Sequence, residues 1–378
     1  MIVSIPKETA EYEQRVALVP ETVSKLIDKG LEVHIQSEAG RASNYLDEAY
    51  RKSGAKIIND RSALFSDADI LLAIQTPPRE DLKKLKKEAV LVCFLWALQN
   101  EDTVEFLKSA NITSLGMDAV PRISRAQNMD ALSSMSSIAG YKATLIAANE
   151  LDRYLPMMMT AAGTIAPAKV LVLGAGVAGL QAIATAKRLG AVVEAFDIRP
   201  AVKEQVESLG AKFVEVPDMD ENTETKGGYA KELSDDKQER QRQVIHEHAQ
   251  KSDIIITTAL IPGKPAPLLI TEKMVHDMHP GSVIIDLAAE QGGNCELTEA
   301  GKTVDINNVK IIGPINIPSS LAYHASQLYS KNMMALLEHL LEEGKPNFDF
   351  EDEITLNTTI TYQGKIISPM LKENQKSE

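Results

Sequence analysis

The sequence has few of the residues that mark several large protein classes. Only two of its 378 residues are cysteines, Cys93 and Cys295, which cannot build a disulfide framework and suit a reducing compartment. Basic residues are scarce relative to acidic ones, 40 against 53, so the formal net charge is −13. Without a basic face for phosphates, the chain is not expected to bind nucleic acid.

Long hydrophobic runs are also missing. The longest, 89–98 and 283–289, fall far short of the ~20 residues that a membrane helix needs, so we expect no direct membrane span. The first residues, MIVSIPKE, have neither a charged leader nor an apolar signal segment and are interpreted as a strand. The seven histidines are scattered, with no carboxylate or cysteine to complete a ligand set, so no metal site is predicted.

One stretch, KVLVLGAGVAGLQ at 169–181, combines an apolar strand, a glycine-rich turn and the start of a helix. Gly174, Gly176 and Gly179 have the G-x-G-x-x-G spacing. We expect Gly174 to make the tight bend, Gly176 to let a pyrophosphate approach the backbone, and Gly179 to let the helix pack closely on its strand. The helix then directs unpaired N–H groups and the positive end of its dipole at the phosphates.

The acidic residue expected after such a turn is present. A second strand, 192–196, ends in Asp197, close to the ~20-residue spacing of dinucleotide-binding folds. An acidic side chain there accepts hydrogen bonds from the adenosine ribose and repels a 2′-phosphate, so the pattern favours NAD over NADP. Arg199 leaves the other cofactor open, since an arginine at this place can hold a 2′-phosphate.

Alternating apolar runs and amphipathic segments predict βα units along the chain, whose length suits two domains. We predict an α/β fold of two Rossmann-like, doubly wound parallel-sheet domains with a cleft between them. The N-terminal domain comprises 1–135 and, discontinuously, 319–378, and the NAD(H)-binding domain comprises 136–318. Predicted helices include 21–29, 101–108, a linking helix at 134–153 and a return helix at 319–342. Predicted strands are 2–5, 32–36, 56–58, 70–75, 90–94, 112–115, 169–173, 192–196, 212–215, 253–257, 282–287 and 309–312.

Four segments have less regular patterns. The run KKLKK at 83–87 is interpreted as a solvated helix face, with an anion site as the alternative. Met157–Met159 are expected to be adaptable packing at the domain junction. The tail at 350–369 alternates like a strand. The acidic run 217–237, with Gly-Gly-Tyr at its centre, is either a surface insertion or a mobile flap that closes over a ligand.

The segment PRISRAQNMDALSS at 121–134 gathers polar side chains just before the linking helix. These are Arg122, Arg125, Gln127, Asp130 and Ser133. One interpretation is structural: Asp130 or Ser133 caps the helix, and an arginine pairs with an aspartate. The other is functional, because the carboxamide of a nicotinamide ring needs donors and acceptors of the Gln, Ser and Arg kind.

Several long motifs point to one family: IPKE, EQRVALVP, PRISRAQNMDALSS, GYKA, PMMMTAAGT, LVLGAGVAGLQAIATAKRLGA, KEQVESLGAKF, GGYAKE, TTALIPGKPAP and GSVIIDLAAEQGGNCE. Together they resemble, nearly end to end, the NAD(H)-binding soluble component (domain I of the alpha subunit) of the proton-translocating NAD(P) transhydrogenases. The chain is more distantly similar to alanine dehydrogenase, which shares the two-domain architecture.

The resemblance implies direct, Re/Si-specific hydride transfer between NAD(H) bound here and NADP(H) bound by a partner subunit, coupled to proton translocation. The residues implied to position the nicotinamide are Arg122, Gln127, Asp130 and Ser133, with Tyr229 on a closing loop. The residues implied to surround the dinucleotide are Ile123, Ser124, Gly174, Gly176, Val177, Gly179, Asp197, Ile198, Arg199, Gly228, Gln241 and Leu260. The resemblance further implies a cytoplasmic homodimer, peripheral on the inner membrane through a membrane-embedded subunit and an NADP(H)-binding beta subunit.

Two alternative functions remain. In alanine dehydrogenases a lysine holds the substrate and a histidine exchanges a proton, and the corresponding positions here are Gln75 and Trp96. A neutral amide cannot replace an ammonium and an indole cannot exchange that proton, although Arg15 is retained. The alternatives are an NAD-dependent, alanine-dehydrogenase-like oxidoreductase and a non-catalytic NAD-binding module.

Overall fold

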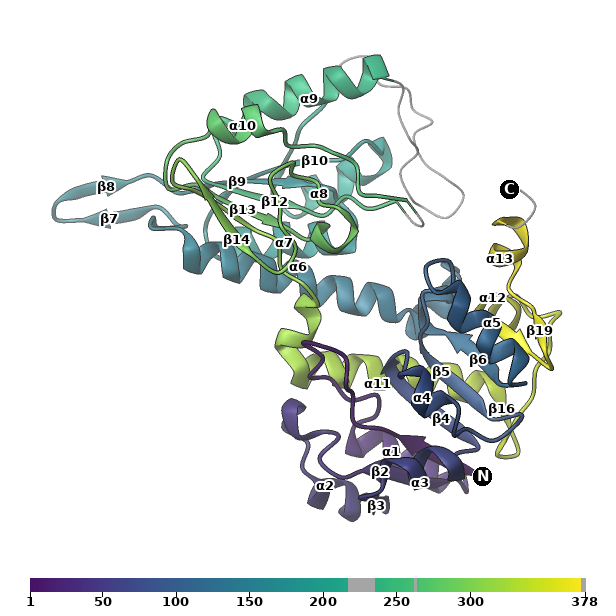
Figure 1. The fold of residues 1–378 in the computed structure, drawn as a ribbon. Coiled ribbons are helices and arrows are strands. Elements are labelled where there is room, and N and C mark those ends of the chain that lie inside the picture. The colour runs from purple at the N-terminus through teal and green to yellow at the C-terminus, as the bar shows by residue number, and fades with distance from the viewer. Residues whose placement is uncertain (217–234, 262–263, 375–378) are drawn as a thin grey trace. The chain divides into compact units, whose positions relative to one another are not determined.

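The chain, in this computed structural model, is an α/β protein built of two compact units (Figure 1). The structure describes residues 1–216, 235–261 and 264–374. Unit 1 comprises Met1–Met135 and Pro318–Glu378, and unit 2 comprises Ser136–Ile317. Among the described residues, no helix has both the length and the apolar character needed to cross a membrane.

Unit 1 contains an eight-stranded sheet in the order β19-β18-β6-β5-β4-β1-β2-β3. Strands β1 to β6 are parallel, and β18 and β19 extend the sheet with antiparallel pairings. The chain fills the sheet outward from β1 in one direction and then returns to place β4 on its other side. The strands are β1 (Ile2–Ile5), β2 (Glu32–Gln36), β3 (Lys56–Ile58), β4 (Ile70–Gln75), β5 (Val90–Phe94), β6 (Thr113–Gly116), β18 (Thr359–Tyr362) and β19 (Lys365–Ile366).

The helices of unit 1 cover this sheet with their apolar sides. The central strands are almost wholly apolar, as expected for parallel strands that are buried on both faces. The helices are α1 (Pro20–Asp28), α2 (Asp47–Lys52), α3 (Arg61–Asp67), α4 (Arg79–Leu82), α5 (Glu101–Ser109), α11 (Ala322–Leu340), α12 (Glu353–Thr358) and α13 (Pro369–Asn374), and a short pair β16 (Leu341–Glu342) and β17 (Lys345–Pro346) follows α11. Helices α3, α4 and α5 share one apolar cluster with β4 and β5.

Unit 2 contains a seven-stranded sheet in the order β11-β10-β9-β12-β13-β15-β14. All neighbours are parallel except β14, which is antiparallel to β15. Its strands are β9 (Lys169–Leu173), β10 (Val192–Phe196), β11 (Lys212–Phe213), β12 (Ile254–Thr257), β13 (Val283–Asp286), β14 (Thr303–Ile306) and β15 (Val309–Ile312), and its helices are α7 (Val177–Arg188), α8 (Lys203–Ser208), α9 (Asp235–Ala249) and α10 (Glu272–His276). The strand order reverses between β9 and β12, the place where doubly wound sheets bind ligands.

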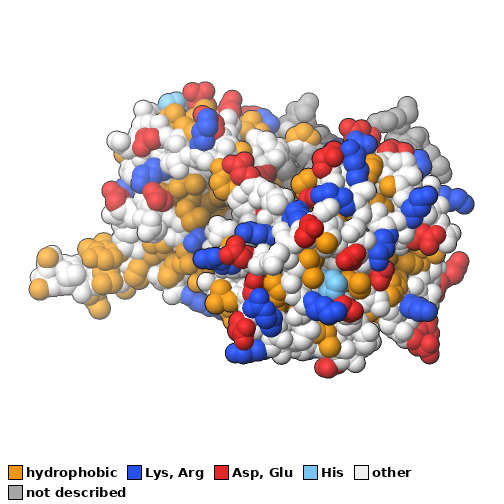
Figure 2. Space-filling model, turned by 60° about the horizontal axis from the view of Figure 1, so that its bottom comes forward, with side chains coloured by type: hydrophobic (Ala, Val, Ile, Leu, Met, Phe, Trp, Pro, Cys, Tyr) orange, Lys and Arg blue, Asp and Glu red, His pale blue; other side chains and the backbone are white. Residues whose placement is uncertain are grey.

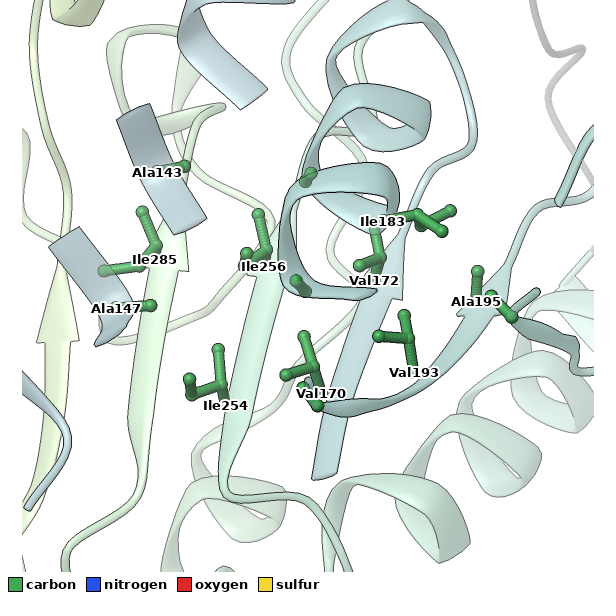
Figure 3. Close-up of a cluster of buried hydrophobic side chains, with 14 of the residues drawn as sticks. Ala143, Ala147, Val170, Val172, Ile183, Val193, Ala195, Ile254, Ile256 and Ile285 are labelled. Atoms are coloured by element: carbon green, nitrogen blue, oxygen red, sulfur yellow. The ribbon is translucent and has the colours of Figure 1, made fainter. Parts of the chain in front are cut away.

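Helix α6 (Ala131–Glu150) begins at the end of the first segment of unit 1 and continues into unit 2. Alternate strand residues of unit 2 form two buried layers, one shared with α6, α7 and α8 and the other with α9 and α10. Ala143 and Ala147 of α6 face Ile285 in the first layer (Figure 3). Small residues let α6 approach α7 so closely that a Cβ added at Gly140 would lie 2.0 Å from the Ala178 carbonyl oxygen.

Three local predictions are wrong. The run at 83–87 forms a turn after α4, not a helix, and Lys83, Lys84 and Lys86 pair with neighbouring acids. The first part of the alternating tail is helix α12, because Asp352 caps it by accepting a hydrogen bond from the Thr355 N–H at 2.9 Å. The segment around the methionines is a hairpin, β7 (Met158–Thr160) and β8 (Gly163–Ile165).

Met157, just before this hairpin, and Met159, within it, do not pack inside the protein, whereas Met158 is half-buried. Met157 is 58% exposed, Met159 is 80% exposed and Ile165 is 44% exposed. Figure 2 shows apolar side chains along the projecting hairpin, whereas acidic and basic side chains are interspersed over the rest of that face. Isolated two-stranded hairpins are marginally stable, and exposed apolar side chains that gather in one place often mark an interaction surface.

Candidate functional site

The glycine-rich turn lies at the edge of the unit 2 sheet where three neighbouring parallel strands end. Leu173, the last residue of β9, pairs with Phe196 of β10 on one side and with Thr257 of β12 on the other. The residues that follow these strands, Gly174, Asp197 and Thr258, therefore gather at one edge, beside the reversal of strand order. Thr258 Oγ1 donates a hydrogen bond to the Gly174 carbonyl at 3.0 Å, which ties the segment after β12 to the turn.

Each glycine of the turn has a distinct geometry. Gly174 has a φ of +99°, which side-chain-bearing residues rarely adopt. A Cβ at Gly179 would lie 1.8 Å from the Gly174 carbonyl oxygen, so helix α7 can pack on the turn only without one. A Cβ at Gly176 would instead meet a single neighbouring atom, Arg199 Nη2 at 4.0 Å, so this side of the turn is open.

The carboxylate of Asp197 holds the turn together. Its Oδ2 accepts a hydrogen bond from the Ala175 N–H at 2.7 Å and from Arg199 Nη2 at 2.7 Å. Its Oδ1 accepts from the Arg199 backbone N–H at 2.9 Å and from Nε at 2.9 Å. These four bonds occupy the roughly four acceptor positions of a carboxylate. A ribose hydroxyl that bonds Asp197 would therefore compete with the Arg199 guanidinium for this carboxylate.

These residues fit a dinucleotide at its pyrophosphate. The turn is open where Gly176 lacks a Cβ, and α7 begins at Val177, where unpaired helix N–H groups and the positive dipole end attract phosphates. The ribose end fits as well, with Arg199 as a competitor for the Asp197 carboxylate. Donors and a buried acid at adjoining strand ends thus suit the phosphates and a ribose of one extended ligand.

The remaining predicted residues of unit 2 take varied positions. Val177 is 40% exposed and Leu260, three residues after β12, is 37% exposed. Gln241 is buried on α9, and Ile198 packs at the margin of the α9–α10 layer. Gly228 and Tyr229, with most of the predicted 217–237 insertion, lie outside the described residues.

The segment 122–133 forms a short 3-10 helix, Ser124–Met129, followed by α6. Asp130 accepts hydrogen bonds from the Ser133 N–H at 2.8 Å and the Ser133 hydroxyl at 2.6 Å, which is the cap expected on the structural interpretation. Arg122, Ser124 and Gln127 are exposed, and Ile123 is half-buried.

Two residues near the end of the chain hold this segment in place. Arg125 pairs with Asp352 at 2.9 Å, so the arginine–aspartate pair that we expected is formed with a residue 227 positions away. Asn332 of α11 donates a hydrogen bond to the Asn128 carbonyl at 2.8 Å. The structure thus supplies both elements of the structural interpretation and still leaves the amide of Gln127 at the surface.

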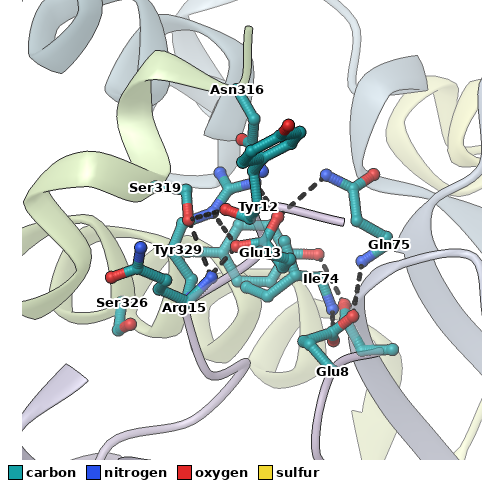
Figure 4. A network of polar contacts seen from close by, with 12 residues as sticks. Glu8, Tyr12, Glu13, Arg15, Ile74, Gln75, Asn316, Ser319, Ser326 and Tyr329 are labelled. Carbon is teal, nitrogen blue, oxygen red and sulfur yellow. Dashed lines mark hydrogen bonds and ion pairs between the residues drawn. The ribbon is translucent and has the colours of Figure 1, made fainter. Parts of the chain in front are cut away.

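Unit 1 buries an ion pair at the loop after β1. Arg15, 3% exposed, donates from Nε and Nη2 to the two oxygens of Glu13 at 2.7 and 2.6 Å. The Gln75 amide donates to the same Glu13 carboxylate at 3.0 Å (Figure 4). The retained arginine is therefore already neutralised by a buried acid.

Glu8, on the same loop, is a second acid and is half-buried. It accepts hydrogen bonds from the Ile74 N–H at 2.6 Å and the Gln75 N–H at 3.4 Å (Figure 4). Burial, together with the nearby Glu13 charge, raises the pKa of Glu8 to about 8, against the opposing effect of the backbone hydrogen bonds. It lines a small cavity of about 150 Å³ with Thr76 and Arg61.

Trp96 lies at the same sheet edge, two residues after Phe94, whose backbone pairs with Gln75. Its φ is +48°, and its backbone N–H donates to Asp118 at 3.0 Å. The ring stacks on Phe94, with 5.7 Å between centroids. Gln75 and Trp96 stand where alanine dehydrogenases have a lysine and a histidine, and neither the amide nor the indole can exchange a proton with a substrate.

Several residues of these sites carry no sequence signal that we recognised. Glu13, Asp352 and Asn294 act through contacts with distant segments, and only the left-handed Gly292–Gly293 pair before Asn294 indicates an unusual backbone there. Within the described residues of the chain, no group of three or more His, Cys, Asp or Glu side chains is arranged to hold a metal ion.

Comparison with known proteins agrees with this architecture. Residues 4–139 match the N-terminal domain of the alanine dehydrogenase/PNT family, and residues 143–369 match its C-terminal domain. The chain is 49% identical to the first part of the NAD(P) transhydrogenase alpha subunit of Rhodospirillum rubrum over 379 residues, covering 98% of this chain and 99% of that protein.

A solved structure and a more distant enzyme extend the comparison. The crystal structure of a transhydrogenase from Sinorhizobium meliloti superimposes with a TM-score of 0.88 at 44% identity, covering 97% of this chain and 100% of the other. Alanine dehydrogenase of Mycolicibacterium smegmatis is 28% identical over 376 residues, with 97% and 95% of the two chains covered. The chain therefore belongs to the alanine dehydrogenase/PNT family, with transhydrogenase alpha subunits as its close relatives.

Proposed function

We propose that this chain is the NAD(H)-binding subunit of a proton-translocating NAD(P) transhydrogenase. In this role it holds NAD(H) for direct, Re/Si-specific hydride exchange with NADP(H) on a partner subunit. The observation that carries the proposal is the edge of unit 2 formed by Gly174, Gly176 and Asp197, because the turn is open on the Gly176 side and lies beside an acid. The end-to-end likeness to transhydrogenase alpha subunits supports the choice of reaction.

Catalysis of this kind depends on position. The bound nicotinamide supplies or accepts the hydride at its ring, and no side chain has to remove a proton. The exposed amide of Gln127 is proposed to orient the ring carboxamide, with Arg122 and Ser133 as further partners. Asp130 holds Ser133 and the start of α6 in place. Tyr229 is proposed to close the site.

The other proposed contacts lie along the dinucleotide. Gly174, Gly176 and Gly179 form the phosphate turn, and Asp197 with Arg199 receives the adenosine ribose. The remaining proposed neighbours of the dinucleotide are Ile123, Ser124, Val177, Ile198, Gly228, Gln241 and Leu260.

The assembly belongs to the proposal as well. We propose a cytoplasmic homodimer that docks on a membrane-embedded subunit and on a beta subunit that binds NADP(H), at the cytoplasmic face of the inner membrane. The apolar hairpin of β7 and β8 supports self-association, since the Met157 and Met159 side chains are exposed in the single chain and would be buried by a second copy.

An alanine-dehydrogenase-like reaction is the second candidate, because the fold is shared. The buried pair of Arg15 with Glu13 opposes it. A 2-oxo acid carboxylate would have to displace Glu13 from the arginine, and Gln75 adds no positive charge to offset that. The proton exchange at the substrate would also lack a donor at Trp96.

The test is a transfer assay with separate proteins. The purified chain is mixed with an NADP(H)-binding beta subunit, and hydride exchange between NADH and an NADP⁺ analogue is followed by absorbance. We expect exchange only when both proteins are present. Absence of exchange while each protein binds its own nucleotide would refute the proposal, and turnover of alanine or pyruvate with NAD(H) alone would establish the second candidate.

A further inference from the structure

The short 3-10 helix before α6 sorts its six residues into three sides. A 3-10 helix has three residues per turn, so side chains three positions apart share a side. Ala126 and Met129 are buried on one side, and Gln127 is exposed on another. The third side carries Arg125 and Asn128. The exposed amide of Gln127 therefore lies between a buried side and the side of Arg125 and Asn128.

This 3-10 helix is long for its kind and needs support from outside. Runs of more than three or four residues are uncommon, because their hydrogen bonds have poor geometry. Its N-cap residue, Ile123, has an apolar side chain that cannot accept a hydrogen bond from the helix. Two later segments of unit 1 supply contacts on the third side. Asn332 of α11 donates to the Asn128 carbonyl at 2.8 Å, and Asp352 accepts from Arg125 Nη2 at 2.9 Å.

The two oxygens of Asp352 have separate partners. Its Oδ1 accepts the hydrogen bond from Arg125. Its Oδ2 caps α12 by accepting from the Thr355 N–H at 2.9 Å, and it lies 2.9 Å from Nε2 of His339 on α11. One carboxylate thus joins the 3-10 helix to α11 and α12. The Arg125 side chain is 60% exposed, so the ion pair itself adds little to the free energy of unfolding.

We propose that Asp352 is a positioning residue for hydride transfer, which through Arg125 holds the 3-10 helix and so keeps the Gln127 amide in place for the nicotinamide. The inference rests on the proposed function, because it takes Gln127 to orient the ring. Hydride transfer depends steeply on how the two rings face each other, so a small displacement of Gln127 lowers the rate. The proposed phosphate and ribose contacts are made by other residues, so NADH affinity should change little.

Two substitutions at Asp352 separate the ion pair from the cap. Asparagine is as good an N-cap as aspartate, and in Asp352→Asn the single oxygen is expected to keep the place of Oδ2, with Thr355 and His339 as partners. The Nδ2 group then faces Arg125, and two donors cannot bond each other. Asp352→Glu keeps the charge for Arg125, but glutamate is not among the preferred N-cap residues. Asp349→Asn is the matched control, the same change at an exposed residue of the loop before α12.

The first experiment follows hydride exchange between NADH and an NADP⁺ analogue with the beta subunit present, and thermal unfolding of each variant. Asp352→Asn should transfer hydride about fivefold more slowly at saturating nucleotide, the effect of one partly exposed ion pair, with an unchanged KM for NADH and little change in stability. Asp352→Glu should be less stable yet transfer faster than Asp352→Asn. The opposite order, with normal transfer in Asp352→Asn and slow transfer in Asp352→Glu, would show that Asp352 acts only as a cap and would overturn the inference.

The second experiment tests whether Asp352 acts through Arg125. Arg125→Ala should slow transfer by about the same factor as Asp352→Asn, because both remove the same contact. Adding Asp352→Asn to Arg125→Ala should then slow transfer no further. Losses of rate that simply multiply in the double variant would contradict the proposal.

A third measurement needs neither nucleotide nor the beta subunit. The Ala126 N–H bonds the Ile123 carbonyl at 3.0 Å in the first turn of the 3-10 helix, so its hydrogen should exchange faster in Asp352→Asn than in the unchanged chain. Equal exchange would overturn the inference. Normal transfer in Asp352→Asn would refute the role of Asp352 alone, whereas absence of transfer by the unchanged chain, with both nucleotides bound, would refute the proposed function.

Discussion

Three buried carboxylates, those of Glu13, Asp197 and Asp286, have their acceptor positions filled by donors from their own unit. Glu13 accepts from Arg15 and Gln75, Asp197 from Ala175 and Arg199, and Asp286 from five groups. Such carboxylates shape loops, since each ties together donors from separate parts of its unit.

Asp197 tests the ribose end of the site. We expect Asp197→Ala to weaken NADH binding by about 1–3 kcal/mol, because a charge-assisted acceptor is lost and the Ala175 N–H loses its partner. The preference for NADH over NADPH should narrow as well, since Arg199 is released from the carboxylate. Fluorescence titration with both nucleotides measures this, and exposed Glu299→Ala is the control for charge. Unchanged affinity for NADH would remove Asp197 from the site.

Glu8 predicts a pH dependence of stability. Its pKa is raised from 4.5 to about 8, so between these values the unfolded chain loses a proton that the folded chain keeps. The contribution of Glu8 to the free energy of unfolding should therefore be fully present below about pH 4.5. It should decrease above that pH and be lost as pH rises through about 8. The full fall is at most about 5 kcal/mol, since one pKa unit is worth about 1.4 kcal/mol.

The variant Glu8→Gln should remove this fall, because its amide still accepts from the Ile74 N–H and does not ionise. Denaturant unfolding followed by the fluorescence of Trp96, the only tryptophan and a residue of the same unit, measures it from pH 5 to 9. Glu11→Gln, an exposed change on the same loop, is the control. A slope in Glu8→Gln equal to that of the unchanged protein would show that Glu8 does not titrate in this range.

Helices and strands were predictable where one local signal sufficed. Strands β9 and β10 are apolar runs that end in a glycine and an acid, and both were predicted to the residue. Strand β14 was not predicted. It lies at the edge of the sheet, and its short TVDI sequence has no fully buried residue, so it lacks the apolar run by which the other strands were recognised. Helix α12 alternates like a strand, yet the Asp352 cap and the burial of Ile354 and Thr358 make it helical.

The candidate site divides in the same way. The glycines and Asp197 follow from spacing, because a single βαβ unit contains them. The capture of Asp197 by Arg199, the pairing of Arg125 with Asp352 and the loop contacts of Asn294 depend on side-chain geometry or on distant segments. Hydrophobic periodicity does not reveal such contacts. The sequence therefore predicted the place of a ligand better than the side-chain contacts that hold the surrounding loops.

The crossing of α6 and α7 gives a prediction of unusual sign. In an ordinary helix Gly→Ala is stabilising by about 1 kcal/mol. Gly140→Ala should instead destabilise unit 2 by about 1–3 kcal/mol, because the new methyl would meet the Ala178 carbonyl in the first turn of α7. NADH binding should weaken too, since that turn follows Gly176. Thermal unfolding and titration test this, with Asn149→Ala on exposed α6 surface as control, and a stabilised Gly140→Ala would contradict it.

The chain as a whole repeats one plan. Each unit has a parallel sheet that grows from a first strand in both directions, β1 in unit 1 and β9 in unit 2. In unit 1 the carboxyl edge is filled by the pair of Glu13 with Arg15, whereas in unit 2 it is open at Gly176. The carboxyl edges of the two sheets therefore differ in chemistry although the strand orders are similar.

Self-association is testable through the hairpin. We expect Met159→Asp to convert a dimer to a monomer in light scattering, because a charge would replace an apolar side chain that is 80% exposed in the single chain. Met370→Asp, a like change at a partly exposed methionine of unit 1, should leave the mass unchanged. A dimer that persists in Met159→Asp would show that the hairpin is not the contact.

The exposed methionines have a chemical consequence. Of the 13 methionines in the chain, Met157 and Met159 present their thioethers to solvent on one short hairpin. Peroxide converts such side chains to polar sulfoxides, which reductases can reverse. In the dissociated chain, oxidative stress should therefore modify these two side chains before the buried methionines of α11, and make the proposed self-association surface polar.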